Sequence, residues 1–164
     1  MKTADLLPTR RTALGLIAVA GLASGASLRP ASAAPPAVRV HRDPGCGCCE
    51  KWVEHLRSAG FPVEVVSSDD MTAVKQRLGV PDALVSCHTA EVAGYVVEGH
   101  VPADAIRRLL EEKPGATGLS APGMPIGSPG MEGGRPEVYD VVLFRRDGGH
   151  ESFGRYRGAT RVGA

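Results

Sequence analysis

Apolar and polar positions follow two different periods along the first half of the chain, and each change of period marks a predicted element. Residues 37–41 alternate and are rich in β-branched side chains, which is typical of a strand. From Cys49 onward, apolar residues recur at helical spacing until Gly60 ends the pattern. Residues 61–66 are mostly apolar and predict a second strand. The helical spacing is carried by Trp52, Val53, Leu56 and Ala59.

The next segments predict a second helix and a hairpin. Asp69 or Asp70 can cap a helix that ends at Gly79, because short acidic side chains and glycine are preferred at these two ends. Residues 89–92 and 95–98 then flank Ala93-Gly94, which indicates a two-residue hairpin turn. The apolar positions of the second helix are Met71, Val74 and Leu78.

A third helix is predicted from Pro102, in its first turn, to the stop at Lys113-Pro114-Gly115. The resulting order is strand, helix, strand, helix, hairpin, helix. With the first two strands parallel, this order predicts an α/β fold with a thioredoxin-like β-α-β-α-β-β-α core. The third helix turns Ala105, Ile106, Leu109 and Leu110 inward.

The composition changes abruptly after this core. Residues 115–136 carry four prolines and seven glycines, so they form either a disordered linker or a functional loop folded onto the domain. The near-repeat Pro122-Gly123-Met124-Pro125 and Pro129-Gly130-Met131-Glu132 puts a thioether in each turn and favours the ordered loop. Residues 138–145 and 151–156 then predict a closing β-hairpin that extends the sheet.

The first 33 residues predict an export signal. A basic start precedes an apolar, small-residue stretch at 14–26 that is too short to span a bilayer comfortably, and Ala31-Ser32-Ala33 supplies a cleavage site. The run Thr9-Arg10-Arg11-Thr12-Ala13-Leu14 resembles a twin-arginine (Tat) signal, with Ala13 in place of the usual Phe. The alternative is an uncleaved membrane anchor. The predicted organisation is therefore a Tat-like signal at 1–33 and a single periplasmic domain at 34–164, without a membrane span after processing.

The charge balance excludes some partners. The full chain has 19 basic and 18 acidic residues, of which four and one lie in residues 1–33, so residues 34–164 keep 15 and 17 and a formal charge of −2. This balance offers no basic face for nucleic acid. A chain of this length suits one domain with a hydrophobic core.

Three of the four cysteines lie within Cys46-Gly47-Cys48-Cys49, at the predicted start of the first helix. The helix dipole favours thiolate there, which is the form that attacks disulfides and binds metals. The motif looks like the redox C-G-P-C turn with a third cysteine in the proline position. Two structural disulfides are the alternative for an exported protein with four cysteines, but crowding of the three sulfurs argues against it.

The position of Cys87 depends on which residues face this turn. If Pro81 faces it as a cis-proline, Cys87 is carried roughly 20 Å away at about 3.3 Å per residue. If residues 81–84 form a short turn instead, Cys87 and His88 occupy that place themselves. We favour the second arrangement because it leaves a hairpin of ordinary length at 89–98.

These donor types suit Cu(I), which accepts two or three soft ligands and is bridged by thiolates into clusters. Zn(II) in a tetrahedral set of three cysteines and one histidine is the alternative. The predicted ligands are Cys46, Cys48, Cys49, Cys87 and His88, with Met124 and Met131 as ligands or as a cover. The other histidines are expected to be structural or at the surface: His41, His55, His100 and His150.

Four separated motifs resemble the secreted CopG-like family of copper-resistance proteins. They are the stretch 43–49 with the three cysteines, Ser86-Cys87-His88-Thr89-Ala90, the run 98–103, and the two Pro-Gly-Met turns at 122–125 and 128–131. The resemblance implies a thioredoxin-like fold in which Cys46, Cys48, Cys49 and Cys87 gather a Cu(I)–thiolate cluster, with His88 and the methionine loop adjacent. It also implies a place in copper efflux and detoxification.

Three functions follow from these patterns. The first is a periplasmic copper-binding protein that holds several Cu(I) ions for storage, for transfer to copper efflux or chaperone proteins, or for interconversion of Cu(I) and Cu(II). The second is a thiol–disulfide oxidoreductase using Cys46 and Cys49, in which the third cysteine is a competing thiol. The third is a domain stapled by zinc or disulfides, with no chemistry of its own.

Overall fold

The structure is a computed structural model that describes residues 34–163. The predicted export signal at 1–33 lies outside the described residues. In the part that is described, no helix is both long and apolar enough to cross a membrane.

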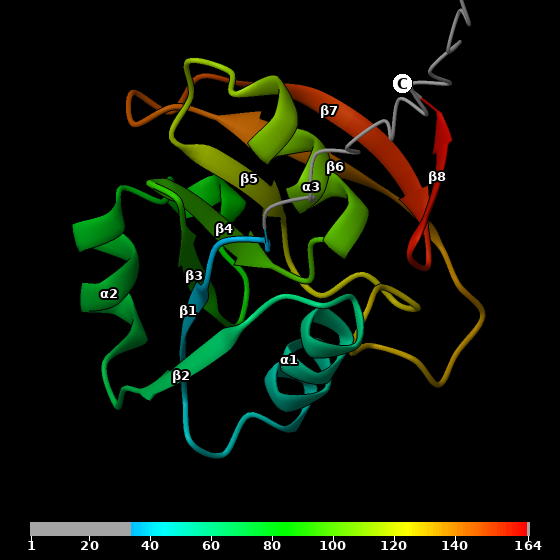
Figure 1. Ribbon diagram of the computed structural model, residues 1–164, viewed down its shortest axis with the longest axis horizontal. Helices are drawn as coiled ribbons and strands as arrows, with labels where there is room; N and C mark the ends of the chain where they lie inside the picture. Colours follow the sequence, from blue (N-terminus) through cyan, green and yellow to red (C-terminus); the bar gives the residue numbers. More distant parts are fainter. Residues whose placement is uncertain (1–33, 164) are drawn as a thin grey trace, which may run out of the picture. The chain divides into compact units, whose positions relative to one another are not determined.

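Eight strands form one mixed sheet in the order β2-β1-β3-β4-β5-β6-β7-β8 (Figure 1). The first two strands pair in parallel, as predicted, and β3 runs antiparallel to β1. The strands are β1 (Val38–Arg42), β2 (Val63–Ser67), β3 (Thr89–Val92), β4 (Tyr95–Gly99), β5 (Gly118–Ala121), β6 (Val138–Phe144), β7 (His150–Arg157) and β8 (Thr160–Gly163). The helices are α1 (Gly47–Ser58), α2 (Met71–Leu78) and α3 (Ala103–Glu112), with a 3-10 turn η1 (Asp82–Leu84).

The predicted α/β order β-α-β-α-β-β-α is confirmed from β1 to α3. Local signals set the ends of α2 as expected: the Asp70 side chain accepts a hydrogen bond from the Ala73 amide, and Gly79 closes the helix in a left-handed conformation. Pro102 is the residue before α3 rather than part of its first turn.

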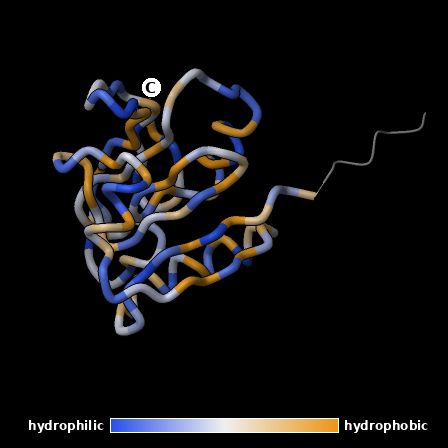
Figure 2. Tube along the Cα trace, turned by 90° about the vertical axis from the view of Figure 1, so that its left-hand side faces the viewer, coloured by the Kyte–Doolittle hydropathy of each residue, from blue (hydrophilic) through white to orange (hydrophobic). Residues whose placement is uncertain are grey.

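The interior is divided by the sheet into two apolar clusters. The larger one joins α1 and α3 to one face, and the smaller one joins α2 and η1 to the other. Neighbouring residues of β4 show the division, because Val97 belongs to the larger cluster and Val96 to the smaller one. Hydrophobic and hydrophilic residues accordingly alternate at short intervals along the trace (Figure 2).

Two strands were not predicted. Residues 115–136 contain β5, whose four residues are all buried and which pairs in parallel with β4. The many prolines and glycines of residues 115–136 concealed this strand. β5 itself contains only one of them, Gly118, and a glycine is needed there because an added Cβ would come within 1.7 Å of the Val96 carbonyl oxygen. The closing hairpin at β6 and β7 is present, and β8 follows it as a further edge strand.

Candidate metal centre

Three cysteines lie at the amino-terminal end of α1, the first helix after β1. Cys46 is the residue that caps the helix, and Cys48 and Cys49 lie in its first turn, where free backbone amides favour negative charge. Cys46 and Cys49 form a disulfide with their Cα atoms 5.4 Å apart, and Cys49 is buried. Cys48 is a free thiol and is partly exposed.

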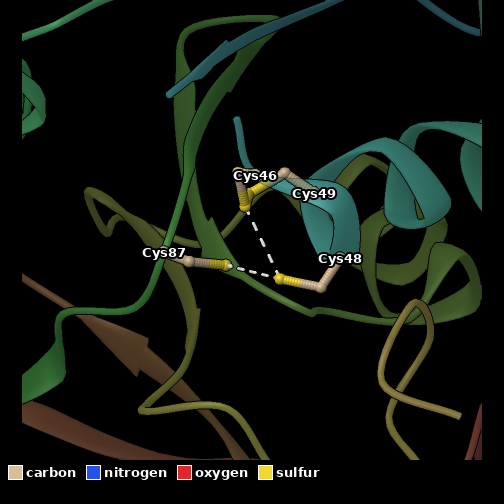
Figure 3. A group of neighbouring side chains, drawn as sticks. All are labelled: Cys46, Cys48, Cys49 and Cys87. Carbon is tan, nitrogen blue, oxygen red and sulfur yellow. Dashed lines mark hydrogen bonds between the residues drawn. A yellow bond between two sulfur atoms is a disulfide. The ribbon is translucent and has the colours of Figure 1, made fainter. Parts of the chain in front are cut away.

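Cys87 reaches this group from another part of the chain. Residues 82–84 form the short turn η1, so the chain returns to the sheet at Thr89 and places Cys87 beside the helix start. The Cys48 sulfur lies 3.5 Å from the Cys46 sulfur and 3.9 Å from the Cys87 sulfur (Figure 3). All four sulfurs lie within 4.8 Å of one another. The expected approach of Cys87 to the other three cysteines is confirmed, whereas their binding of a metal stays a prediction.

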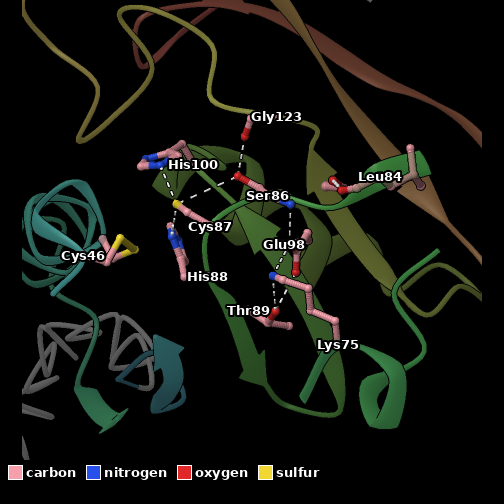
Figure 4. Close-up of polar contacts among 12 residues, drawn as sticks. Cys46, Lys75, Leu84, Ser86, Cys87, His88, Thr89, Glu98, His100 and Gly123 are labelled. Carbon is pink, nitrogen blue, oxygen red and sulfur yellow. Dashed lines mark hydrogen bonds and ion pairs between the residues drawn. A yellow bond between two sulfur atoms is a disulfide. The ribbon is translucent and has the colours of Figure 1, made fainter. Parts of the chain in front are cut away.

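Two imidazoles contact the Cys87 sulfur (Figure 4). Nδ1 of His88 lies 3.2 Å from it and Nε2 of His100 lies 3.1 Å from it. Both histidines are fully buried, and the His88 ring also packs on Trp52 with 4.3 Å between ring centroids. Cys87, His88 and His100 therefore form a second donor group that shares one sulfur with the first.

A backbone carbonyl sets the tautomer of His100. Its Nδ1 lies 2.7 Å from the carbonyl oxygen of Pro129, which can only accept a hydrogen bond, so Nδ1 carries the proton. Burial lowers the pKa of His100 and keeps the ring neutral. Nε2 therefore presents a lone pair to the Cys87 sulfur, the form in which an imidazole accepts a thiol proton or binds a metal.

The buried surroundings hold the site in its uncharged form. Burial, followed by the neighbouring Cys48, raises the pKa of Cys87 to about 12. Burial also lowers the pKa of His88 well below its ordinary value. The neighbouring His100 and Lys75 act in the same direction, because a proton on His88 would be repelled by positive charge on either of them. In the absence of a cation, Cys87 keeps its proton at neutral pH while both imidazoles stay without an extra one.

The structure adds His100 to the candidate ligands, which the sequence analysis did not do because it expected a structural residue there. The signal was present in the predicted hairpin, because a two-residue turn at Ala93-Gly94 pairs Thr89 with Glu98. Continuing that register by two residues puts Cys87 opposite His100. The backbone contact from the Gly99 amide to the His88 carbonyl shows that the register continues in this direction.

The loop that carries the two methionines folds against α1. At Gly130, with φ +88°, an added Cβ would lie 2.7 Å from the Cys48 carbonyl oxygen and 2.9 Å from the Trp52 amide, so the backbones touch there. Met131 follows this contact and is partly buried, whereas Met124 is 53% exposed. The loop is thus ordered against the helix that bears the cysteines, and ligation by Met124 or Met131 stays a prediction.

The remaining histidines divide into three cases. His41 is buried and lies 2.9 Å from a Glu91 carboxylate oxygen, a structural role. His150 is exposed on β7. The expectation that His55 is a surface residue is wrong: its Nε2 accepts a hydrogen bond from the Ala103 amide at the start of α3, and burial lowers its pKa. Sequence spacing on α1 alone gave no sign that α3 begins there.

The described residues thus define a class of protein: an α/β domain with a cluster of thiols at a helix start and two neutral imidazoles behind it, a group able to hold a metal ion. A family model described as "Protein of unknown function, DUF411" matches residues 84–131, which include Cys87, both site histidines and both loop methionines. No curated protein sequence matches significantly.

Two solved structures are similar over nearly their whole length. One, described as copper resistance protein CopG, form 1, is 49% identical, with 76% of this chain and 99% of that chain covered and a TM-score of 0.71. The other, form 2 of the same description, is 49% identical, with 74% and 98% covered and a TM-score of 0.71. The chain belongs to the family of copper resistance protein CopG.

Proposed function

We propose that the protein binds copper for copper resistance and that, when all four cysteines are reduced, it holds several Cu(I) ions in a thiolate cluster. The similar solved structures carry a copper-resistance description, which supports copper as the cargo. The observation that carries the proposal is the gathering of four sulfurs from two distant segments within 4.8 Å. Thiolates this close repel one another unless cations lie among them.

The donor chemistry suits Cu(I). Sulfurs that are 3.5 and 3.9 Å apart suit a soft ion that accepts few ligands and shares thiolates with its neighbours. One Zn(II) could also be held in a closed tetrahedron, by four cysteines or by three cysteines and a histidine, so it is the copper-resistance description of the similar structures that favours copper here. Cys46, Cys48, Cys49 and Cys87 are the proposed ligands, His88 and His100 bind or support the copper at Cys87, and Met124 and Met131 ligate or cover the cluster.

The disulfide adds a redox step to this proposal. While Cys46 and Cys49 are joined, neither supplies a thiolate, so cluster formation requires a dithiol reductant that opens this bond by exchange and is itself oxidised to a disulfide. In the reverse direction, the two thiolates give one electron each to two Cu(II) ions, which leaves two Cu(I) and the disulfide. Storage, transfer and interconversion of Cu(I) and Cu(II) all use this same group of sulfurs.

Reconstitution of the reduced protein with Cu(I) under anaerobic conditions tests the proposal. We expect more than one Cu(I) per monomer by metal analysis, copper–sulfur bonding by sulfur-edge absorption, and a large loss of bound copper in Cys46→Ser and Cys87→Ser. His150→Ala, at an exposed position on β7, is the matched control and is expected to bind as the wild type does. Equal copper in the wild type and in Cys46→Ser would rule the cluster out.

The second candidate is a thiol–disulfide oxidoreductase, which the Cys46–Cys49 disulfide at a helix start favours. The free Cys48 sulfur, 3.5 Å from Cys46, competes as a resolving thiol and argues against clean exchange. Copper-independent reduction of insulin that persists in Cys48→Ser would favour this function over copper binding.

We place the mature protein, residues 34–164, in the periplasm after export by the Tat route, with copper efflux or chaperone proteins as its partners. Fractionation of cells with an antibody against the mature chain tests the location.

A further inference from the structure

A buried ion pair lies directly behind the Cys87 segment. Glu98 of β4 is completely buried, and its Oε1 accepts a hydrogen bond of 2.6 Å from the Lys75 ammonium, whose side chain is only 12% exposed. Replacing such a pair by well-packed apolar residues is often neutral for stability, so its presence is weak evidence that the fold needs it. The other contacts of this carboxylate show what else it does.

Both carboxylate oxygens are fully used. Oε1 also accepts a 2.6 Å hydrogen bond from the backbone amide of Ser86, and Oε2 accepts a 2.6 Å hydrogen bond from the Thr89 hydroxyl (Figure 4). The Lys75 ammonium donates in addition to Thr89. Glu98 therefore ties the residue before Cys87 to α2 and to the start of β3.

The Ser86–Cys87 backbone needs this support because it lies outside the sheet. The β3–β4 ladder begins at Thr89, and the last backbone contact beyond it joins the Gly99 amide to the His88 carbonyl. Ser86 packs directly on Gly99, where an added Cβ would come within 2.5 Å of the Ser86 Cβ. The segment thus packs against the end of β4, where the charge-assisted hydrogen bond from the Ser86 amide to Glu98 holds its backbone. Two contacts with Gly123 also hold it: the Ser86 hydroxyl donates to the Gly123 carbonyl, and the Gly123 amide donates to the Val85 carbonyl.

We propose that Glu98 is the positioning residue of Cys87: by accepting the Ser86 amide, it holds the Cys87 sulfur against Cys48 and the two histidines. Lys75 supplies the charge that lets the carboxylate be buried, and it does not touch the sulfurs in any contact described. The role in copper binding rests on the proposed function, whereas the placement of the Cys87 thiol does not.

A pocket beside this segment can supply water if the contact with Glu98 is lost. Its volume is about 320 Å³, and it is lined by three residues of α2, by Asp82 of η1, and by Val85 and Ser86. If Glu98 no longer accepts the Ser86 amide, water from this pocket can do so. The contacts of Val85 and Ser86 with Gly123 remain, so we expect the segment to stay on the domain while the Cys87 sulfur shifts relative to Cys48.

The test uses two double variants that differ only at residue 98. Lys75→Met with Glu98→Gln removes both charges and keeps an acceptor for the Ser86 amide, whereas Lys75→Met with Glu98→Leu removes the acceptor as well. The first readout needs no copper. In the protein with its Cys46–Cys49 disulfide intact, diamide oxidises Cys48 and Cys87 to a second disulfide and is itself reduced to the hydrazine, and mass spectrometry measures the rate.

We call the double variant with Glu98→Gln the glutamine pair and the one with Glu98→Leu the leucine pair. We expect the glutamine pair to form the Cys48–Cys87 disulfide at the wild-type rate and the leucine pair to form it at least tenfold more slowly. The second readout, Cu(I) affinity of the reduced proteins against a competing chelator, is expected to fall at least tenfold in the leucine pair only. Phe144→Leu, in the apolar cluster beside α2, is the control for a general loss of stability and is expected to keep both wild-type values. Equal cross-linking rates in the two double variants would overturn the proposal.

A third variant covers the case in which the leucine pair does not fold. Glu98→Asp keeps the charge pair and withdraws the carboxylate by one methylene, so we expect slower cross-linking here too, and a wild-type rate would contradict the proposal. If the wild type itself binds no Cu(I), the proposed function fails, and the cross-linking rates still decide the role of Glu98.

Discussion

The protonation of Cys87 gives the most direct test of the site as described. Burial and the neighbouring Cys48 raise the pKa of this thiol to about 12 from an ordinary 9.0. The thiolate, and not the thiol, reacts with alkylating reagents. At pH 8, an ordinary thiol of pKa 9.0 is about 10% thiolate, whereas a thiol of pKa about 12 is about 0.01% thiolate, a difference of roughly a thousandfold.

The assay follows the alkylation of Cys87 by iodoacetamide as a function of pH, with peptide mass spectrometry to separate Cys87 from Cys48. The Cys46–Cys49 disulfide protects the other two sulfurs. In the native protein the Cys87 rate is expected to rise about tenfold per pH unit up to pH 11, because each unit increases the thiolate tenfold while the pKa stays above the pH. In urea, the same cysteine is expected to level off above about pH 9.

A plateau of the native Cys87 rate near pH 9 would refute the reasoning, because it would mean that the fold does not suppress the thiolate. The same proton bears on copper binding. A thiol that is protonated at neutral pH must release its proton when a metal binds, so the apparent affinity of the Cys87 position rises with pH. Proton release measured in a weakly buffered Cu(I) titration checks this consequence.

Two further predictions concern the packing around the site. Gly130→Ala is expected to lower the free energy of unfolding by about 1–3 kcal/mol more than Gly123→Ala, because both glycines have positive φ but only the first touches α1, and urea unfolding of the two variants measures the difference. Equal values would show that the loop is not packed on the helix. Trp52→Phe removes a buried 2.9 Å hydrogen bond to the Val101 carbonyl and part of a fully buried ring, so a loss of about 1–3 kcal/mol is expected in the same assay, and an unchanged urea midpoint would contradict the packing described.

Local sequence signals accounted for most of the fold. The ends of α2 follow from an aspartate cap and a glycine stop, and the β3–β4 hairpin follows from its two-residue turn, because these rules depend on residues within a few positions of one another. β5 was missed because its formation depends on pairing with β4 and on complete burial, which are long-range effects that a run of glycine, leucine, serine and alanine does not reveal.

In the candidate site, too, the contacts that follow from local sequence signals could be predicted, whereas a contact that depends on a distant loop could not. Cys46, Cys48 and Cys49 could be grouped from sequence because one helix start holds them. Cys87 could be added because the short turn at 82–84 shortens the path back to the sheet. The tautomer of His100 could not be predicted, since it depends on the Pro129 carbonyl of a loop folded back over α1, almost thirty residues further along the chain.

The two candidate functions make opposite demands on the Cys46–Cys49 bond. Exchange chemistry needs that bond to form and break while Cys48 stays out of the reaction, yet the Cys48 sulfur lies 3.5 Å from Cys46 and 3.9 Å from Cys87. A metal cluster needs all four sulfurs reduced. Close spacing of the sulfurs then favours metal binding, because each added cation relieves the repulsion among the thiolates. The neutral imidazoles at Cys87 are suited to a metal cluster, because the lone pair of His100 can bind a metal or accept a thiol proton. Thiol exchange would be better served by a protonated histidine, which stabilises a reactive thiolate. The crowding and the neutral histidines therefore both favour metal binding as the function of this group of side chains.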